Sequence, residues 1–229
     1  TFKKYGYMAI PVVDNENRLV GIVTVDDIME VMEEEATEDI ERMAGVMSDD
    51  QDSDYLDIGV FRHVKNRLPW LLLMTGMLMI TGTLISQFEE VLSQVIVLVA
   101  YLPLFMGTGG NTGTQAATLI IRGLSVDEVD LKDAGKVLWK EMRVSVILGI
   151  VLRVFNFAKI ILIDRLPVEI GLTVAISMIL IVVFAKLLGG MLPMLAKKVG
   201  VDPALMATPM ISSITDMVSS CIYLATASI

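Results

Sequence analysis

The sequence predicts a mainly α-helical membrane protein, in which five transmembrane helices follow a short β-β-α segment and an acidic connecting helix. Of its 229 residues, 54% are hydrophobic, whereas a soluble domain has about 45–50%. The mean hydropathy is +0.67. From Leu68 onward, the apolar stretches are long enough to cross a bilayer. About half of the 27 acidic residues instead lie between Asp26 and Asp57, so the acidity belongs to one short segment before the membrane helices.

The first part of the chain is expected to form a β-hairpin followed by a helix. Residues 8–13 and 19–25 are short β-branched runs, and the turn-forming residues 14–17 join them. Thr24 can cap the following helix, and Asp27, three residues later, completes a capping box. We assign residues 1–32 to this cytosolic unit. Because the sequence opens in the middle of such a unit, we expect further chain upstream.

A second, acidic helix is expected from about Glu33 to Val46. Ile40, Met43 and Ala44 give it a narrow apolar stripe, and residues 48–57 have the composition of a solvated linker. We therefore assign residues 33–57 to an acidic connecting helix and linker. Composition alone fits a solvated charged face as well as it fits a surface that senses cations.

Residues 58–229 are predicted to form the membrane domain. A bilayer core of about 30 Å needs roughly 20 helical residues. Five apolar stretches meet this need, namely residues 68–88, 91–121, 144–163, 168–192 and 204–228. An odd number of spans places the two ends of the membrane domain on opposite sides of the bilayer.

Lysine and arginine residues predict which side is cytoplasmic, because they are enriched in cytoplasmic loops. The connections on one side contain Arg62, Lys65, Arg67, Arg122, Lys132, Lys136, Lys140, Arg143, Lys197 and Lys198. The opposite connections, residues 86–90 and 164–167, contribute Arg165 alone. We therefore expect a multi-pass protein of the plasma (inner) membrane with its N-terminal side in the cytoplasm and its C-terminus external.

Asp216 is the principal candidate for cation chemistry. It follows Pro203 by thirteen residues, which places it about 20 Å along a helix and near the middle of the membrane. A carboxylate costs about 2.5–3.5 kcal/mol there, so it usually faces a partner or a wet pathway. Oxygen atoms for a cation are available nearby from Ser212, including its backbone carbonyl. The alternative is a structural aspartate paired with a basic residue of another helix.

A glycine-rich stretch lies within the second predicted span. Gly109, Gly110, Asn111 and Gly113 are expected to break this helix, as is Pro209 in the last span, because irregular backbone at membrane depth lines a cavity or is buried in protein. Close helix packing through the small residues is the alternative explanation. The stretch lacks the Gly-Lys-Ser/Thr ending of a nucleotide phosphate loop.

The residue types limit the metals and reactions that the chain can support. With one histidine, His63, and one cysteine, Cys221, a nitrogen- and sulfur-ligated zinc site is almost excluded. Oxygen ligands favour Mg²⁺, Ca²⁺ or Mn²⁺. A rival hypothesis is a regulated intramembrane enzyme that uses Asp216. The sequence argues against it, since no zinc-protease motif and no second mid-membrane acid are present. We expect no enzymatic activity and no nucleic-acid partner.

Three blocks in order resemble the MgtE family of magnesium channels and transporters. They are Val20-Gly21-Ile22-Val23-Thr24-Val25-Asp26-Asp27, then Gly109-Gly110-Asn111-Thr112-Gly113-Thr114-Gln115, and finally Asp202-Pro203-Ala204-Leu205 leading to Asp216. The first block on its own resembles the end of a CBS domain. The resemblance covers nearly the whole chain. The chain differs from the family pattern at Thr114 and Thr208, where asparagine is expected, and at Arg153 and Lys186, which are unusual within spans.

The resemblance implies a homodimeric, Mg²⁺-selective channel or transporter in the lipid bilayer. Asp216 of both copies would recognise hydrated Mg²⁺ in the pore, and Mn²⁺ or Co²⁺ are alternative divalent substrates. It also implies that cytosolic Mg²⁺ closes the pore through the acidic region. The residues expected to bind this regulatory ion are Asp26, Asp27, Glu34, Glu35, Glu38 and Asp202.

Overall fold

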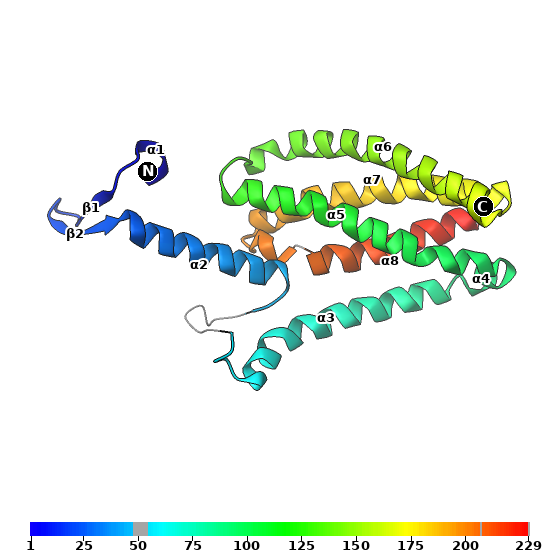
Figure 1. Cartoon of the computed structure of the whole chain (residues 1–229), viewed down its shortest axis with the longest axis horizontal. Coiled ribbons are helices and arrows are strands. Elements are labelled where there is room, and N and C mark those ends of the chain that lie inside the picture. The colour runs from blue at the N-terminus through cyan, green and yellow to red at the C-terminus, as the bar shows by residue number, and fades with distance from the viewer. Residues whose placement is uncertain (48–54, 207, 229) are drawn as a thin grey trace.

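The computed structural model describes residues 1–47, 55–206 and 208–228. The molecule is elongated, with a small hairpin and one long helix at one end and a set of long helices at the other (Figure 1). The N-terminus lies at the hairpin end, whereas the C-terminus lies at the far end of the long helices, beside α4 (Glu89–Gln94). The described parts of the chain are therefore mainly helical, as predicted.

The N-terminal segment contains the predicted hairpin. A short helix α1 (Phe2–Tyr5) precedes strands β1 (Ala9–Val13) and β2 (Leu19–Thr24), which pair antiparallel. The Asp14 side chain closes the turn by accepting hydrogen bonds from the backbone N–H groups of Glu16 and Arg18, at 2.8 and 2.9 Å. Asp14 is one of the turn-forming residues of the predicted loop, and an aspartate at this position stabilises a turn in this way.

One continuous helix, α2 (Val25–Met43), follows the hairpin. The predicted capping box is present: Thr24 N–H donates to Asp27 Oδ2 at 2.7 Å. The prediction of two separate helices, with the second from about Glu33 to Val46, is wrong. No glycine or proline interrupts residues 25–43, and nothing in this stretch gives the backbone a reason to stop. The helix ends just before Gly45, whose φ of +73° is readily adopted by glycine.

Four helical stretches in the described residues are long and apolar enough to span a membrane: Val60–Ser86, Leu131–Asp164, Val168–Val199 and Pro203–Ala227. The first is α3 (Val60–Ser86). The second joins the 3₁₀ turn η2 (Leu131–Asp133), α6 (Ala134–Lys159) and the π-helical turn η3 (Ile160–Asp164). The third is α7 (Val168–Val199), and the fourth joins the turn η4 (Pro203–Met206) to α8 (Thr208–Ala227). Four of the five predicted spans thus correspond to such stretches.

The remaining predicted span, residues 91–121, is divided differently from the expectation. A 3₁₀ helix η1 (Ile96–Tyr101) leads into α5 (Leu102–Ser125), and α5 passes without interruption through the glycine-rich stretch. The predicted break at Gly109, Gly110, Asn111 and Gly113 is therefore wrong. Pro209 likewise does not break a helix, because it is the second residue of α8, and proline is well tolerated in a first helical turn.

The glycines of α5 allow neighbouring helices to approach closely. A Cβ atom on Gly189 of α7 would overlap the carbonyl oxygen of Gly113. A Cβ on Gly113 itself would lie 2.7 Å from Ile211 of α8 and 3.2 Å from the Ala185 carbonyl oxygen of α7. Close packing through small residues, the alternative explanation of the stretch, is thus what the structure contains.

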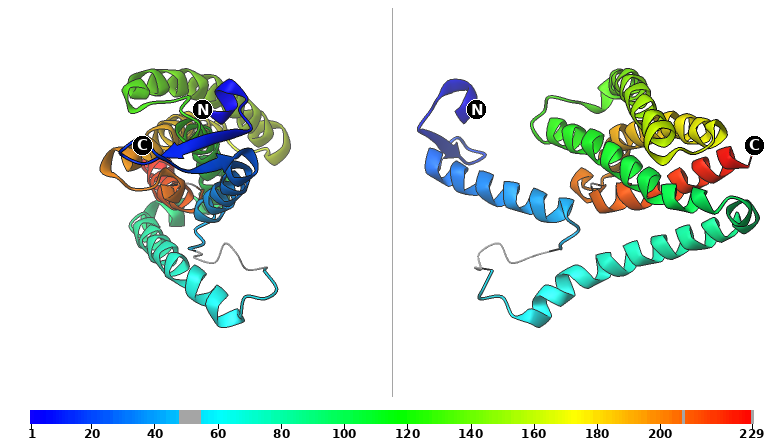
Figure 2. Two further views of the ribbon diagram at one scale, coloured as in Figure 1. Left: turned by 90° about the vertical axis from the view of Figure 1, so that its left-hand side faces the viewer. Right: turned by 45° about the vertical axis from the view of Figure 1, so that its right-hand side comes forward.

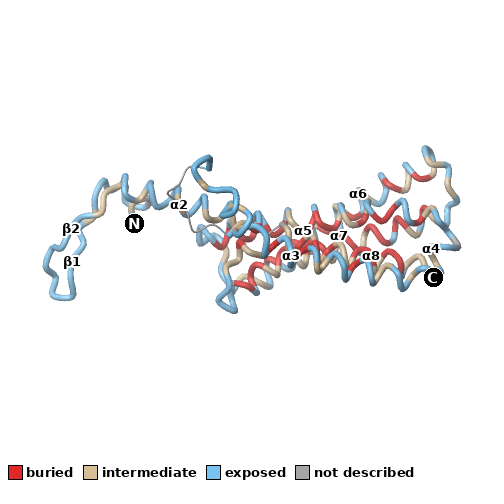
Figure 3. The backbone as a smooth tube through the Cα atoms, turned by 90° about the horizontal axis from the view of Figure 1, so that it is seen from below, coloured by how far each residue is buried: buried red, intermediate tan, exposed pale blue. Residues whose placement is uncertain are grey.

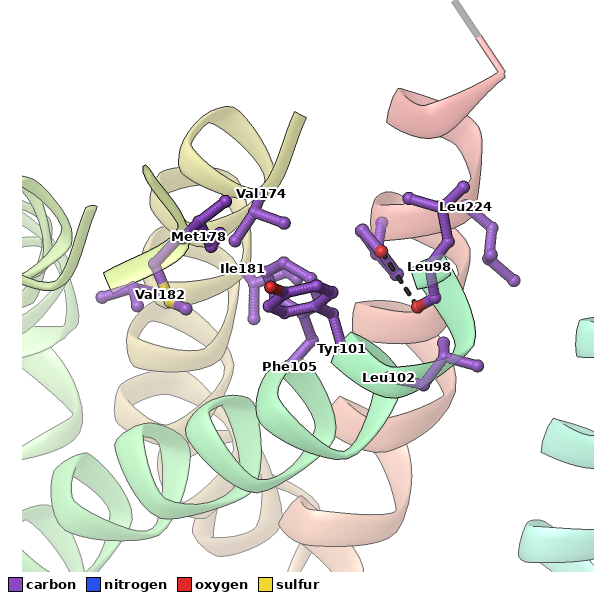
Figure 4. Packing of buried hydrophobic residues seen from close by; sticks show 11 residues of the cluster. Leu98, Tyr101, Leu102, Phe105, Val174, Met178, Ile181, Val182 and Leu224 are labelled. Atoms are coloured by element: carbon purple, nitrogen blue, oxygen red, sulfur yellow. Dashed lines mark hydrogen bonds between the residues drawn. The ribbon is translucent and has the colours of Figure 1, made fainter. Parts of the chain in front are cut away.

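Buried positions follow α5, α7 and α8 along their length, while the hairpin is exposed (Figure 3). Near the C-terminal end of α8, Phe105 and Tyr223 pack with ring centroids 4.3 Å apart, and the Tyr223 hydroxyl donates to the Leu98 carbonyl at 3.0 Å (Figure 4). Helix α3 lies against α8 along one side only, and its first turns stand apart from the other helices (Figure 2). The packed core therefore fixes the C-terminal part of α8 against α5 and α7, about two turns beyond Asp216.

Candidate cation site

Asp216 lies near the middle of α8, eight residues after the helix begins at Thr208, or about 12 Å along its axis. Its side chain is half-buried. Ser212 and Ser219, about one turn away on either side, face α5: a Cβ on Gly110 would lie 3.2 Å from Ser212 Oγ, and one on Gly109 would lie 2.5 Å from Ser219 Oγ. Asp216 therefore occupies a helix face that borders the glycine-rich surface of α5.

The Asp216 carboxylate forms no hydrogen bond or ion pair with another described residue, although its backbone carbonyl accepts one from Ser220 Oγ at 2.8 Å. This observation bears on the alternative of a structural aspartate held by a basic residue, because no such partner is present among the described residues. Lys186, one of the basic residues within the spans, is instead close to Glu141, at 3.8 Å. A mid-helix carboxylate without a protein partner is available to an external cation.

The oxygen atoms around Asp216 differ in their availability. Thr215 Oγ1 donates to the carbonyl oxygens of Ile211 and Ser212, at 2.8 and 2.9 Å. Because Ser212 lies within α8, its carbonyl also faces the backbone N–H of Asp216, four residues later. A carbonyl oxygen has two lone pairs, so a water of a bound ion would share them with these donors. Ser219 Oγ is buried and has no hydrogen-bond partner within the described residues. The α5–α8 contact therefore holds an unused hydroxyl about one turn from the carboxylate.

Helix α5 has two contrasting faces. Gly109, Gly110 and Gly113 are buried against α7 and α8, whereas Asn111 is exposed on the opposite face. Gly107, Gln115, Thr118 and Arg122 are exposed at positions that share this face with Asn111. Polar side chains at membrane depth usually face protein or water rather than lipid. The exposed face of α5 therefore needs polar neighbours, and the described residues of one copy of the chain do not supply them.

A second group of charged residues joins the end of α2 to the loop before α8. Arg42 forms ion pairs with both Glu38 and Asp202, and Asp202 Oδ1 also accepts a hydrogen bond from Ala204 N–H at 2.8 Å. A cavity of about 300 Å³ borders this contact. Burial raises the pKa of the Asp39 carboxyl, and the nearby carboxylates of Asp202 and Glu35 raise that pKa further. Carboxylates from both elements thus crowd around one arginine.

Of the other predicted ligands of a regulatory cation, Glu35 contributes its charge near Asp39, whereas the rest lie farther along α2. Asp26 and Asp27 lie at the opposite end of α2, about 24 Å from Arg42 along the helix axis. Asp27 is engaged in the capping box, and its hydrogen bonds with Thr24 lower the pKa of its carboxyl. Glu34 and Glu35 lie on the intervening turns. Among the described residues, no three histidine, cysteine, aspartate or glutamate side chains are grouped closely enough to hold a metal ion.

Two structural contacts were not foreseen from the sequence. Glu141 of α6 is the buried partner of Lys186 within the candidate span Leu131–Asp164, so the expectation that no second acid lies at membrane depth is wrong. Its place in the chain, between Lys140 and Arg143, resembles an ordinary charged helix flank. Gly45 packs directly against the indole ring of Trp70 in α3, so that a Cβ atom at Gly45 would overlap the ring. The positive φ of Gly45 has no sequence signal beyond the glycine itself.

Together, the long apolar helices, the unpaired mid-helix carboxylate and the acidic helix define a multi-span membrane protein with an acidic segment before its membrane helices. The sequence profile of the MgtE family, described as a divalent cation transporter, matches residues 102–226, and that of the CBS domain matches residues 1–34. The chain belongs to the MgtE family, as its three sequence blocks indicated. This is a family of transporters, so the prediction that the chain is no enzyme is confirmed.

Three curated relatives, each named magnesium transporter MgtE, are similar over almost the whole chain. The protein of Thermus thermophilus is 44% identical over 97% of the chain and 49% of its own length. That of Bacillus subtilis is 38% identical over 96% of the chain and 48% of its own length. The Enterococcus faecalis protein is 31% identical over 100% of the chain and 49% of its own length. The chain thus spans about half the length of the curated relatives it matches.

Proposed function

We propose that this chain is the membrane and connecting part of a transporter that moves Mg²⁺ across the bilayer, with Asp216 as the residue that recognises the ion. The observation that carries the proposal is the position of Asp216, half-buried in the middle of an apolar helix with no partner among the described residues. The names of the three relatives support magnesium as the substrate.

The chemistry of Mg²⁺ suits a single carboxylate from each copy of the chain. Mg²⁺ gives up its water reluctantly and is usually bound through one or two carboxylates with several waters retained. In a homodimer, the Asp216 side chains of two copies would meet one hydrated ion, and the Ser212 carbonyl would accept hydrogen bonds from its waters. Without the ion, two facing carboxylates repel each other. The site therefore favours a divalent cation and requires no dehydration.

The exposed polar face of α5 supports both the dimer and the fifth membrane span. Asn111, Gln115 and Thr118 are unfavourable against lipid, and a second copy together with a water-filled path would give them polar neighbours. In this arrangement, α5 crosses the bilayer with α3, α6, α7 and α8, and residues 58–229 form a five-span domain. The distribution of lysine and arginine supports a cytoplasmic N-terminal side and an external C-terminus.

The acidic helix is proposed to regulate the path from the cytoplasm. Residues 1–32 would form the end of a CBS domain, and residues 33–57 would connect it to the membrane domain. Cytosolic Mg²⁺ bound by Glu34, Glu35, Glu38 and Asp202, and by Asp26 and Asp27 nearer the hairpin, would reduce the repulsion between these carboxylates. An ion that binds the compact arrangement more tightly shifts the equilibrium toward it, and the contact between α2 and η4 is where closure would act.

Mn²⁺ and Co²⁺ remain alternative substrates in this proposal, since both accept oxygen ligands in sites of similar geometry. Competition experiments with each ion against Mg²⁺ uptake would rank them.

The decisive experiment measures Mg²⁺ uptake by the full-length protein in liposomes that contain a Mg²⁺-sensitive dye. Asp216→Ala and Asp216→Asn are expected to abolish uptake, because both remove the charge that attracts the ion. Ser213→Ala is a matched control, since Ser213 lies on the same helix but donates to Met74 Sδ of α3 at 3.3 Å, and it is expected to retain uptake. Wild-type uptake by folded Asp216→Ala protein would remove Asp216 from the pathway.

A further inference from the structure

An open cavity of about 380 Å³ lies at the start of α3. It is unrelated to Asp216 and to the acidic contact of α2. Its lining residues are Tyr55, Val60, His63, Val64, Arg67, Leu68 and Leu71. Its size falls within the range of small-molecule sites, and it lies at the end where the apolar part of α3 begins.

The cavity has a polar rim. The His63 ring lies against the Tyr55 ring with centroids 4.9 Å apart, and His63 Nε2 is 3.4 Å from the Tyr55 carbonyl oxygen. On its other side, His63 Nδ1 is 3.4 Å from Arg67 Nη2. A guanidinium has five N–H donors, so Arg67 keeps most of them for a ligand while His63 fixes its orientation.

The floor of the cavity is apolar. Val64, Leu68 and Leu71 follow one another at helical spacing on the same face of α3. Leu71 lies about 6 Å further along the axis than Arg67, in the direction of the hydrocarbon core. A ligand that fits both parts therefore carries an anionic or strongly polar head and an apolar tail.

The neighbouring side chains show that this end of α3 is built for an amphiphilic environment. Leu56, Val60 and Phe61 are 89, 75 and 91% exposed, and the first turns of α3 stand away from the other helices (Figure 2). Large apolar side chains with basic neighbours are typical of segments at the surface of a membrane. Acyl chains rather than water are the favourable surroundings for them.

The local charge selects the sign of the head group. Arg62, Lys65 and Arg67 lie within six residues, and no acidic residue occurs between Asp57 and Glu89. A lysine or arginine close to an anionic membrane surface strengthens binding by about fivefold each. A zwitterionic head group gains less from this cluster, because its own positive group opposes the arginines.

We propose that this cavity binds an anionic phospholipid of the bilayer. The lipid phosphate accepts hydrogen bonds from the Arg67 guanidinium, which His63 and Tyr55 hold in place. The first part of one acyl chain lies along Val64, Leu68 and Leu71. The site is independent of the proposed transport path, because it requires only that α3 spans the membrane.

The test uses the purified full-length protein and native mass spectrometry with short-chain phosphatidylglycerol, with phosphatidylcholine as the zwitterionic comparison. Wild-type protein is expected to bind phosphatidylglycerol about tenfold more tightly than phosphatidylcholine. Arg67→Gln should weaken phosphatidylglycerol binding about five- to tenfold and phosphatidylcholine binding by a smaller factor, because the phosphate of both lipids meets Arg67 but only phosphatidylglycerol carries a net negative charge. Inorganic phosphate, which lacks an acyl chain, should not compete.

Lys140→Gln is the matched control, since Lys140 is an exposed basic residue of α6 far from the cavity in sequence. It should change binding less than about twofold. His63→Gln is a second variant that leaves the charge of Arg67 intact, and it should weaken binding by an intermediate factor. Equal losses in Arg67→Gln and Lys140→Gln would indicate general surface charge and overturn the proposal. Disulfide crosslinking of Leu68→Cys between two copies, in a Cys221→Ala background, would also overturn it by showing that protein covers the cavity.

Discussion

Lys186 Nζ of α7 lies 3.8 Å from Glu141 Oε2 of α6, and both side chains are buried. The two charges compensate each other inside the membrane domain. Lys186 follows Ala185, and Asp216 follows Thr215; both Ala185 and Thr215 border Gly113 of α5. Lys186 and Asp216 therefore lie at a similar depth, where an uncompensated positive charge would oppose a cation on the proposed path to Asp216.

Removing one partner of this pair should lower the free energy of unfolding more than removing both partners does. Lys186→Met leaves the Glu141 carboxylate buried without a counter-charge, and breaking a buried pair costs about 3 kcal/mol or more. The double variant Lys186→Met/Glu141→Leu leaves no charge and should recover most of the lost stability. The measurement is the thermal unfolding midpoint of the full-length protein in detergent. Double and single variants with the same midpoint would show that the pair is not coupled.

The contact between α5 and α7 yields a second prediction. Gly189→Ala would force a Cβ atom into the Gly113 carbonyl oxygen, and because backbone atoms of packed helices cannot move aside easily, the loss of stability should be about 3 kcal/mol. Gly82→Ala is the matched control, since a Cβ at Gly82 of α3 has no neighbour within 4 Å. The measurements are the expression yield and the thermal unfolding midpoint of the two variants. Equal behaviour would mean that α5 and α7 are not in contact at Gly189.

The sequence was informative wherever a local rule decides the structure. Thr24 with Asp27 predicted the start of α2, and apolar length predicted five spans, four of which correspond to helical stretches long and apolar enough to cross a membrane. It was not decisive for α5, because the same glycines suit both a broken helix and a close helix contact, and only the positions of Gly189 and Ile211 on other helices distinguish the two. The division of the acidic stretch into two helices is wrong, because no glycine or proline between residues 25 and 43 ends the first helix.

The candidate site likewise has features that the sequence predicts and features that depend on tertiary packing. Asp216 could be found because a lone carboxylate in an apolar stretch has few explanations. Its lack of a protein partner among the described residues could not be known from sequence, nor could the pairing of Lys186 with Glu141, which lie 45 positions apart. Similarly, the crowding of Arg42, Glu38 and Asp202 depends on the packing of α2 against η4.

Arg42 provides a test of how the acidic contact is held together. Arg42→Gln removes the positive charge shared by Glu38 and Asp202, so the contact should depend more strongly on Mg²⁺. Because the arginine is partly exposed, each lost pair contributes only about 0.2–1 kcal/mol, and the Mg²⁺ concentration for half-maximal protease protection of α2 should rise about two- to fivefold. Arg18→Gln, which removes an exposed pair with Glu16 on the hairpin, is the control. An unchanged concentration in Arg42→Gln would exclude a role for Arg42 in this contact.

The junction between α2 and α3 yields the final prediction, because Gly45 combines a positive φ with a direct contact to Trp70. Gly45→Ala should lower the free energy of unfolding by about 1 kcal/mol, because alanine is strained at a positive φ. Overlap of the new Cβ with the indole ring should lower it by about 1–3 kcal/mol more. Gly6→Ala separates the two effects, since Gly6 has a similar φ of +65° but no neighbour within 4 Å of a Cβ. Trp70 fluorescence, recorded in a Trp139→Phe background, should shift to longer wavelength in Gly45→Ala as the ring is displaced from its buried site, and should not shift in Gly6→Ala. Identical spectra for the two variants would show that Gly45 does not hold the end of α2 against α3.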